Sequence, residues 1–524
     1  MKDLLPVRAS FRPDEPVEVE LRGLEAGARV TLWHLDEQVG EAVADSVARF
    51  GPLPEGGYGV EADGLRTAVD VVGEPFRRLR YGFVASFEAN RDTDAVVENV
   101  RRLHLNAVMF YDWMYRHAEL LPRGDEFDDA LGRHLSYETV RRLAGALGAA
   151  GSLPIGYAAV YAVGREHREA WADEGLYRAD GSQWQLGEDF LWLVDPGSDR
   201  WLAHLTAQLV SARDHVGFAG FHLDQFGWPK AAARADGRVV DLAEAFPRLI
   251  ERVRTALPDA RLVFNNVNDF PTWTTASAPQ DAVYIEVWPP HDSLGHLGAL
   301  AEKAKRLAPH KPISLAAYLS CFPRDEAAGR EAMRLELAVA FSHGATCLLH
   351  GEESAVLVDP YYVRNHAMDR VSADAARAYY DFAVRYGELL FDRESVDVTR
   401  SYVGGVNEEI RVEADAPVAT ECVPGCVWVR SVRTRLGIVI HLIDLTEQPE
   451  VAWDAPKRPS RPRSGTKVVV ERVGPAPRFL FASPESAPSL ERLEPERDGR
   501  HDVVAIPPFH TWAFVWVSSQ PSAA

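Results

Sequence analysis

The sequence predicts a multidomain α/β protein in which a (β/α)8 TIM barrel lies between two β-sandwiches. Apolar runs alternate with helical patterns through the middle of the chain, whereas both ends of the chain show strand patterns alone. At 524 residues the chain is also too long for one compact core. We therefore expect an N-terminal immunoglobulin-like β-sandwich over residues 1–75, a barrel over 76–393 and a C-terminal β-sandwich over 394–524.

The N-terminal region shows the pattern of short β-strands. Apolar and polar residues alternate at period two over residues 17–21 and 30–33, which is typical of strands with one buried face. Turn signals that contain glycine or proline follow at 24–27 and 54–57. No residue here points to chemistry, so we expect this region to support the rest of the chain.

The middle of the chain alternates strand and helix patterns. One helical pattern places Phe246, Ile250 and Val253 on one face, and another begins after Ser136. Eight strands alternating with helices over roughly 300 residues fit one closed barrel better than an open sheet. The eight runs that we predict as strands are 81–87, 106–112, 153–161, 218–225, 261–268, 282–288, 312–320 and 345–351.

The last 130 or so residues return to strand patterns, and a small domain of this size is ordinary for a β-sandwich. The predicted strands there are 426–429, 437–445, 467–470 and 512–517.

Composition excludes several classes of function. The net charge of −20 argues against binding to nucleic acid, which needs a basic surface. No run approaches the roughly 18 apolar residues of a membrane span, so we expect no membrane association. The N-terminus shows no apolar segment of a secretory signal, and the four cysteines are few for a secreted scaffold. These features favour a cytoplasmic protein, and they leave its oligomeric state open.

No motif predicts a cofactor or a metal. None of the predicted helices opens on a glycine fingerprint for phosphate or dinucleotide binding. The histidines His117, His222, His350 and His366 lack the spacing of a metal motif. We therefore expect chemistry that uses side chains alone.

Two carboxylates end predicted strands in polar and aromatic surroundings. Asp224 lies near the end of the fourth run and Glu286 near the end of the sixth, so both face the same mouth of the predicted barrel. Paired carboxylates are the equipment of glycoside cleavage, in which one protonates the leaving oxygen and the other attacks or activates water. Asp224 lies among His222 and Gln225, which we expect to keep it ionised as the nucleophile.

The neighbours of Glu286 predict the complementary role. Ile285, Val287 and Trp288 form an apolar setting that raises the pKa of the carboxyl and suits a general acid. Trp288 lies two residues beyond Glu286 and therefore on the same side of the strand. The flat faces that can pack on sugar rings are those of Tyr111, Trp113 and Trp288. The asparagines that end the fifth run, which are Asn265, Asn266 and Asn268, are either ligands of sugar hydroxyls or turn formers.

These residues stand in long motifs, which are YGFV at 81–84, NAVMFYDWMYRH at 106–117, GFHLDQ at 220–225, YIEVW at 284–288, LHGE at 349–352, DPYY at 359–362 and NH at 365–366. Together they resemble the motifs of glycoside hydrolase family 66, the family of dextranases and cycloisomaltooligosaccharide glucanotransferases. The resemblance extends over all three predicted parts of the chain.

The resemblance implies a retaining enzyme that acts on α-1,6-glucosidic linkages of dextran or isomaltooligosaccharides. It carries the nucleophile over to Asp224 and the general acid/base to Glu286. The matched motif residues that it implies as glucose ligands are Tyr111, Asp112, His117, Glu352 and Asn365. With the residues singled out by pattern, the expected substrate-binding set is completed by Trp113, His222, Gln225, Asn266 and Trp288.

Three functions remain open after this step. The first is a dextranase-like hydrolase, and the second is a transglycosylase that forms or opens cyclic isomaltooligosaccharides. Cyclising members of the family carry a carbohydrate-binding module inserted late in the barrel, whereas here one helix separates Ser320 from Ala345, so we disfavour cyclisation. The third is a non-catalytic carbohydrate-binding protein, against which both intact carboxylate motifs argue.

Overall fold

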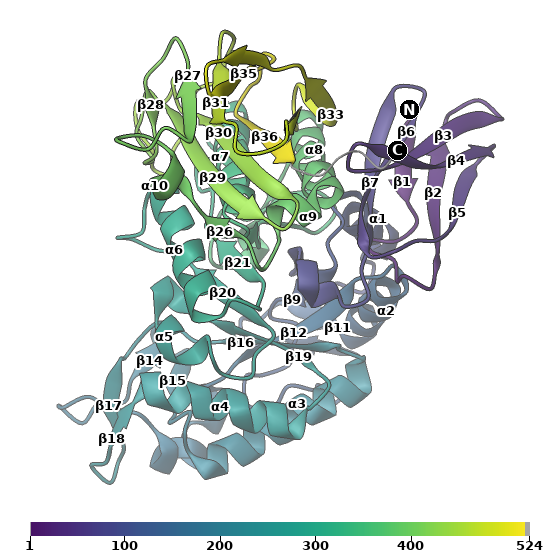
Figure 1. The fold of residues 1–524 in the computed structure, drawn as a ribbon. Coiled ribbons are helices and arrows are strands. Elements are labelled where there is room, and N and C mark those ends of the chain that lie inside the picture. Colours follow the sequence, from purple (N-terminus) through teal and green to yellow (C-terminus); the bar gives the residue numbers. More distant parts are fainter. Residues whose placement is uncertain (1, 519–524) are drawn as a thin grey trace.

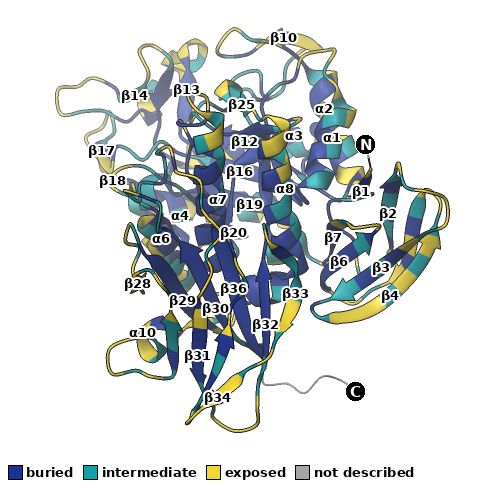
Figure 2. Cartoon of the chain, turned by 90° about the horizontal axis from the view of Figure 1, so that it is seen from above, coloured by how far each residue is buried: buried dark blue, intermediate teal, exposed yellow. Residues whose placement is uncertain are grey.

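The computed structural model describes residues 2–518 of the chain. Figure 1 shows three regions in space: N-terminal strands (purple), a central region with helices (blue to green), and C-terminal strands (green to yellow). Figure 2 shows the strands of the central region buried, while exposed residues gather in loops and outer strands. The largest apolar core therefore lies in the central region.

One large curled sheet organises the central region, and its neighbouring strands pair in parallel. The last run of the series provides β22 and β23, of which β22 pairs with β21 and β23 pairs with β8. This run thus joins the two ends of the series. The strands are β8 (Tyr81–Val84), β9 (Ala107–Phe110), β12 (Leu153–Ala159), β16 (Gly220–Asp224), β19 (Arg261–Asn265), β20 (Ala282–Glu286), β21 (Ile313–Ala316), β22 (Thr346–Cys347) and β23 (His350–Gly351).

Each of the eight predicted runs contains a strand, although every strand is shorter than its run. The last run differs most, because its pairing is interrupted between β22 and β23. A Cβ atom at Gly351 would lie 2.0 Å from the main-chain oxygen of Phe83, so a glycine is required where β23 meets β8.

Helices follow the strands of the curled sheet. The pattern around Phe246 lies in α4, and the pattern after Ser136 is α2, where the Ser136 side chain accepts a hydrogen bond from the Thr139 amide. The helices are α1 (Thr93–Arg102), α2 (Tyr137–Ala149), α3 (Asp199–Val216), α4 (Leu242–Ala256), α5 (Thr272–Thr275), α6 (Leu294–Leu307), α7 (Glu326–Ser342), α8 (Arg370–Arg385), α9 (Gly387–Leu390) and, in the C-terminal region, α10 (Thr399–Tyr402).

Short antiparallel strands pair with one another in the loops that follow several strands of the curled sheet. They are β10 (Glu126–Asp128) with β11 (His134–Ser136), β13 (Ala162–Gly164) and β14 (Gln185–Leu186) with β15 (Leu191–Leu193), β17 (Ala231–Ala233) with β18 (Val239–Asp241), and β24 (Ala355–Val356) with β25 (His366–Ala367).

The N-terminal region consists of two antiparallel sheets with an apolar core of their own. One sheet has the order β1 (Asp3–Pro6), β2 (Pro16–Arg22), β5 (Val47–Pro52). The other has the order β4 (Glu37–Ala44), β3 (Ala28–His34), β6 (Gly56–Ala62), β7 (Leu65–Val71).

The C-terminal region is also built from two sheets around a separate apolar core. One contains β26 (Val396–Asp397), β28 (Val418–Ala419), β29 (Val427–Thr434), β30 (Gly437–Asp444), β36 (Trp512–Ser518), β32 (Arg478–Ser483) and β33 (Ala487–Leu493). The other contains β27 (Ile410–Glu413), β31 (Lys467–Glu471), β35 (His501–Ala505) and β34 (Glu496–Asp498).

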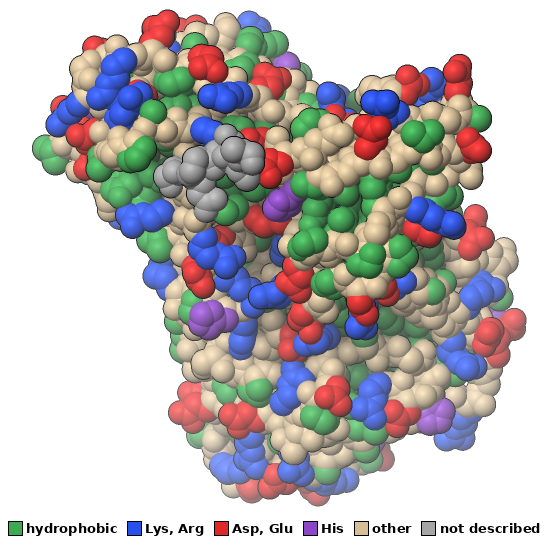
Figure 3. Space-filling model, turned by 45° about the vertical axis from the view of Figure 1, so that its right-hand side comes forward, with side chains coloured by type: hydrophobic (Ala, Val, Ile, Leu, Met, Phe, Trp, Pro, Cys, Tyr) green, Lys and Arg blue, Asp and Glu red, His purple; other side chains and the backbone are tan. Residues whose placement is uncertain are grey.

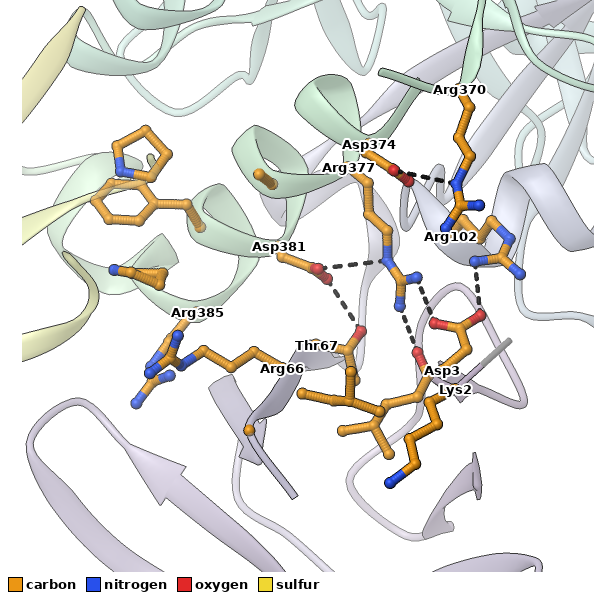
Figure 4. A pocket seen from close by; sticks show the side chains of 17 residues that line it. Lys2, Asp3, Arg66, Thr67, Arg102, Arg370, Asp374, Arg377, Asp381 and Arg385 are labelled. Atoms are coloured by element: carbon orange, nitrogen blue, oxygen red, sulfur yellow. Dashed lines mark hydrogen bonds and ion pairs between the residues drawn. The ribbon is translucent and has the colours of Figure 1, made fainter. Parts of the chain in front are cut away.

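Ion pairs join the N-terminal region to α8 and α1. Arg377 of α8 pairs with Asp3 at 2.6 Å and with Asp381 at 3.5 Å, while Arg102 of α1 pairs with Asp3 at 2.7 Å. We call these four residues the arginine junction; Figure 4 shows Arg377 between the two carboxylates. They line a cavity of about 380 Å³ together with residues of β7 and with Pro484 and Pro488.

Candidate active site

Asp224 and Glu286 are the last residues of β16 and β20. Since the strands of the curled sheet run parallel, both side chains lie at its carboxyl edge. Only β19 separates the two strands. A Cβ atom at Gly220 would lie 1.9 Å from the main-chain oxygen of Arg261, so the glycine permits the close approach of β16 to β19.

The side chain of Asn265, at the end of β19, bridges the two acids. Its Nδ2 donates to Asp224 Oδ1 at 2.7 Å and to Glu286 Oε2 at 2.8 Å. These two carboxylate oxygens consequently lie no farther apart than the two bonds end to end, which is about 5.5 Å. We refer to Asp224 and Glu286 below as the acid pair.

Each acid has one further donor of its own. The Tyr157 hydroxyl donates to Asp224 Oδ2 at 2.7 Å, and the Tyr318 hydroxyl donates to Glu286 Oε1 at 2.8 Å. All four carboxylate oxygens of the acid pair therefore accept a hydrogen bond from a neutral group.

A chain of tyrosine hydroxyls continues from Glu286. The Tyr318 and Tyr362 hydroxyls lie 3.3 Å apart, and the Tyr362 and Tyr284 hydroxyls lie 3.1 Å apart. Since the Tyr318 hydroxyl donates its hydrogen bond to Glu286, its oxygen accepts a hydrogen bond from the Tyr362 hydroxyl. The Tyr362 oxygen accepts in turn from the Tyr284 hydroxyl. The ring of Tyr111 stacks on that of Tyr362 with centroids 4.5 Å apart, which fixes this chain at the mouth of the sheet.

Burial sets the electrostatics of the acid pair. It raises the pKa of Asp224 to about 7, aided by the charge of Glu286 and opposed by the bonds from Tyr157 and Asn265. Burial also raises the pKa of Glu286, opposed by the bonds from Asn265, Tyr318 and Trp288. Within residues 2–518, neither carboxylate forms an ion pair with a lysine, arginine or histidine. The acid pair is thus suited to hold one proton near neutral pH.

The expectation that His222 and Gln225 keep Asp224 ionised is wrong. His222 is buried below the acid pair, and its Nδ1 lies 3.2 Å from the Tyr81 hydroxyl. The Gln225 side chain points to the other face of the strand, where its Nε2 donates to the main-chain oxygens of Asn265 and Phe270. Gln225 holds the loop after β16 in place and contacts no open surface.

Three further residues expected to bind substrate are buried and serve the fold. Trp113 is fully buried, packs on Phe218 and donates from Nε1 to the main-chain oxygen of Tyr157. Asn266 is also fully buried and donates to the main-chain oxygen of Tyr284 at 2.8 Å. Glu352 accepts from the Ala85 and Ser86 amides and pairs with Arg91. These contacts correct their assignment as substrate ligands.

Two of the remaining expected ligands, His117 and Asn365, lie away from the acid pair. Burial lowers the pKa of His117 to about 4, and its ring packs edge-on against Phe190. Asn365 donates from its side chain to the main-chain oxygen of Tyr362 at 2.8 Å and so supports the loop that carries Tyr362. Neither residue contacts the acid pair.

Tyr111, Asp112 and Trp288 do lie beside the acid pair. Burial raises the pKa of Asp112 to about 7, and its charge in turn raises that of Asp224. Asp112 has a φ of 49°, an uncommon backbone conformation for a residue other than glycine. The half-buried ring of Trp288 lies 5.7 Å from that of Tyr318.

Four residues that contact the acid pair or its donors were indicated weakly or not at all by the sequence pattern: Asn265, Tyr157, Tyr318 and Tyr362. Asn265 was one of three asparagines for which ligand and turn former were both open. Tyr157 and Tyr318 lie 67 and 32 residues from the acids that they contact. These contacts depend on the register of neighbouring strands, which pairs Tyr157 with His222 and Asn265 with Tyr284 and which sequence spacing does not record.

The described part of the chain lacks two features, a metal-binding cluster and a membrane-spanning helix. Within residues 2–518, no three or more His, Cys, Asp or Glu side chains are grouped so as to hold a metal ion. In the same part of the chain, no helix has both the length and the apolar character needed to cross a membrane. Figure 3 shows acidic and basic side chains interspersed over one face of the molecule.

The chain resembles known proteins along most of its length. The family model described as Glycosyl hydrolase family 66 matches residues 57–516. Two curated relatives from Niallia circulans, each named cycloisomaltooligosaccharide glucanotransferase, are 24% and 25% identical over 364 and 369 residues. Each alignment covers 60% of this chain but only 37% or 38% of the relative, so the chain spans well under half their length.

A solved structure shares the fold. The crystal structure of a Paenibacillus sp. cycloisomaltooligosaccharide glucanotransferase complexed with cycloisomaltoheptaose superposes with a TM-score of 0.88 at 18% sequence identity. The superposition covers 98% of this chain and 100% of that one.

Proposed function

Because the chain belongs to glycosyl hydrolase family 66, we propose that it breaks α-1,6-glucosidic bonds in isomaltooligosaccharides and passes the glucosyl unit to an acceptor. The observation that carries the proposal is the acid pair, two carboxylates bridged by one amide at the carboxyl edge of the curled sheet. Paired carboxylates in such a setting supply the acid and the nucleophile that glycosidic cleavage needs.

The proposed function is accompanied by a proposed domain architecture. We assign the curled sheet and its helices to a (β/α)8 TIM barrel over residues 76–393, with an immunoglobulin-like β-sandwich over 1–75 and a β-sandwich over 394–524. The parallel series that β22 and β23 join at its ends supports the barrel. The paired sheets around separate apolar cores support the two sandwiches.

We assign a retaining mechanism to the acid pair. Asp224 attacks the anomeric carbon and forms an ester, while Glu286 gives its proton to the departing glycosidic oxygen. Glu286, now ionised, then takes a proton from the acceptor hydroxyl, whose oxygen attacks the anomeric carbon and frees Asp224. The separation of at most about 5.5 Å between the bridged oxygens supports retention, since inverting enzymes keep their carboxyls about 6.5–9.5 Å apart.

Three residues around the acid pair are proposed to bind the sugar. The rings of Tyr111 and Trp288, which lie beside the acid pair, are proposed to pack against the apolar side of a pyranose. The Asp112 carboxylate, which burial leaves with a pKa of about 7, is proposed to accept hydrogen bonds from sugar hydroxyls.

The acceptor decides between two outcomes of one chemistry. Transfer to a sugar hydroxyl is our first choice, because both curated relatives are named as glucanotransferases. Hydrolysis is the second candidate, and one observation favours it. Within the described residues, α7 is the only helix between β21 and β22, and the short loops on either side of it leave no room for an inserted module.

Product analysis tests the proposal. The purified protein is incubated with linear isomaltooligosaccharides, a cyclic isomaltooligosaccharide and dextran, and the products are separated by length. We expect longer or cyclic oligosaccharides next to shorter ones, which indicates transfer. Formation of shorter oligosaccharides alone would assign hydrolysis, and intact substrates in all three incubations would refute the proposed function.

A further inference from the structure

Asn265 is the one side chain in the described part of the chain that bonds to both members of the acid pair. An asparagine amide carries two N–H groups, and each of them is directed to a different carboxylate. Tyr157 and Tyr318, by contrast, serve one acid each. Asn265 is therefore placed to respond to the charge of either acid.

The orientation of this amide follows from chemistry. If it were turned round, its oxygen would face the two carboxylate oxygens, and acceptors would oppose acceptors. In the orientation present, the Asn265 Oδ1 is buried and has no hydrogen-bond partner among residues 2–518. The two bonds to the acid pair thus outweigh the loss of a partner for Oδ1.

The backbone around Asn265 is fixed from both sides. Its main-chain oxygen accepts from the buried Gln225 side chain at 3.0 Å, and its strand pairs with β16 and β20. Asn265 is 3% exposed, so water does not compete for its N–H groups. The amide is consequently a rigid donor held midway between the acids.

We propose that Asn265 is a positioning residue that stabilises the single negative charge of the acid pair on whichever acid carries it. The inference rests on the proposed retaining reaction. In the reactive form that this mechanism requires before cleavage, Asp224 is ionised and Glu286 holds the proton. After the glycosidic bond breaks, Asp224 is an ester and Glu286 is ionised, so the charge has moved from one end of the amide to the other.

The other groups that face the acid pair cannot take this role. The titratable side chains around it are Tyr111, Asp112, Tyr157, Tyr284, Tyr318 and Tyr362. None of them is a cation, and burial raises the pKa of every one of these tyrosines, which keeps them neutral. A preorganised neutral donor is worth most where a charge develops in a dry site.

The first test measures the contact without any substrate. Carboxyl ¹³C resonances of Asp224 and Glu286 are assigned with the Asp224→Asn and Glu286→Gln variants and followed by titration. We expect Asn265→Leu to raise the pKa observed at both carboxyls, because both lose a donor to the ionised form. Tyr157→Phe should act chiefly on Asp224, and Tyr318→Phe chiefly on Glu286.

The second test measures both halves of the reaction. With an activated aryl α-isomaltoside, Asn265→Leu should slow formation and breakdown of the glycosyl-enzyme by about 100- to 1,000-fold each. Asn266→Ala is the matched control, because the neighbouring amide bonds to the backbone: it should lower the melting temperature and leave the pH profile in place.

Two results would overturn the inference: a titration in which Asn265→Leu leaves either carboxyl unchanged, or kinetics in which only one half of the reaction slows. An inactive wild-type protein would refute the proposed function instead, while the titration would still decide the contact.

Discussion

The acid pair and the arginine junction both bury carboxylates, but their partners differ. At the junction, burial raises the pKa of Asp3, and Arg377 and Arg102 together outweigh it and hold that pKa below its usual range. At the acid pair every donor is neutral, and the pKa values of Asp224 and Glu286 stay raised. Cations fix a carboxylate in its ionised form, whereas neutral donors leave it able to exchange a proton.

This difference separates structural from chemical use of the same side chain. The junction ties α8 and α1 to the first strand, so its carboxylates need only a constant charge. A general acid must change its charge in each turnover, and its pKa must lie near the working pH. A protein pays for such a site in stability, because buried carboxylates without cations are unfavourable when ionised.

Removal of the charge of Asp224 should have the largest effect of the substitutions considered. We expect Asp224→Asn to lower kcat by about 10,000-fold or more, because the nucleophile is lost. At pH 7.5 the same change should raise the melting temperature by about 2–4 °C, since an uncompensated buried charge disappears. Activity assays and calorimetry measure both effects, and a variant that is inactive and also less stable would contradict the comparison.

Removal of a cation at the junction should do the opposite. Arg377→Leu leaves Asp3 and Asp381 without their shared partner and should lower the free energy of unfolding by about 3–5 kcal/mol. The folded variant should keep near-normal kcat. The matched control is Arg12→Leu, whose pair with Asp14 is exposed and should be worth less than about 1 kcal/mol. Equal effects of the two substitutions in denaturant titrations would rule out the proposed role of the junction.

The two regions should also respond oppositely to pH. The folded pKa of Asp224, about 7, lies above its ordinary value of 3.8, so its stability contribution is lost as the pH rises between these values. The folded pKa of Asp3 lies below 3.8, so its contribution is present above that value and lost as the pH falls below it.

Melting curves across pH measure this contrast. The advantage of Asp224→Asn over the wild type should grow from pH 4 to about pH 7. The deficit of Asp3→Asn should shrink as the pH falls below 3.8. Parallel curves for the two variants would show that neither carboxylate is linked to folding as described.

The smallest effect concerns the tyrosine hydroxyls behind Glu286. Tyr362→Phe removes one donor from the chain that ends on Glu286, and it should lower kcat/KM by about 3- to 10-fold, or about 1 kcal/mol. The basic limb of the pH profile of kcat/KM should move to higher pH, because the ionised form of Glu286 loses part of its hydrogen-bond stabilisation. Tyr161→Phe is the control, since that hydroxyl donates to the main-chain oxygen of Trp228; it should leave the limb in place.

The sequence predicted what depends on local pattern. All eight central strand runs contain strands, because apolar runs between turn signals report burial directly. The carboxyl ends of parallel strands share one edge, which was enough to place Asp224 and Glu286 together.

The sequence predictions of site residues failed where the contacts of a side chain depend on the face of the strand to which it points or on the register between strands. Gln225 and Asn266 follow the acid and the bridging amide by one residue and therefore point to the opposite faces of their strands. Tyr157 of β12 and Tyr318, which lies two residues beyond β21, reach the acids only after the sheet has brought these strands beside β16 and β20. Sequence spacing carries no record of such contacts.

The anomeric form of the first product tests the central claim, that Asp224 and Glu286 act as a retaining pair, most directly. Wild-type protein is mixed with an isomaltooligosaccharide, and ¹H NMR follows the anomeric signals at the newly formed end or linkage before mutarotation. We expect the α-anomer first, because two displacements at one carbon restore the starting configuration. The β-anomer appearing first would contradict it, since a single displacement by water would then be the reaction.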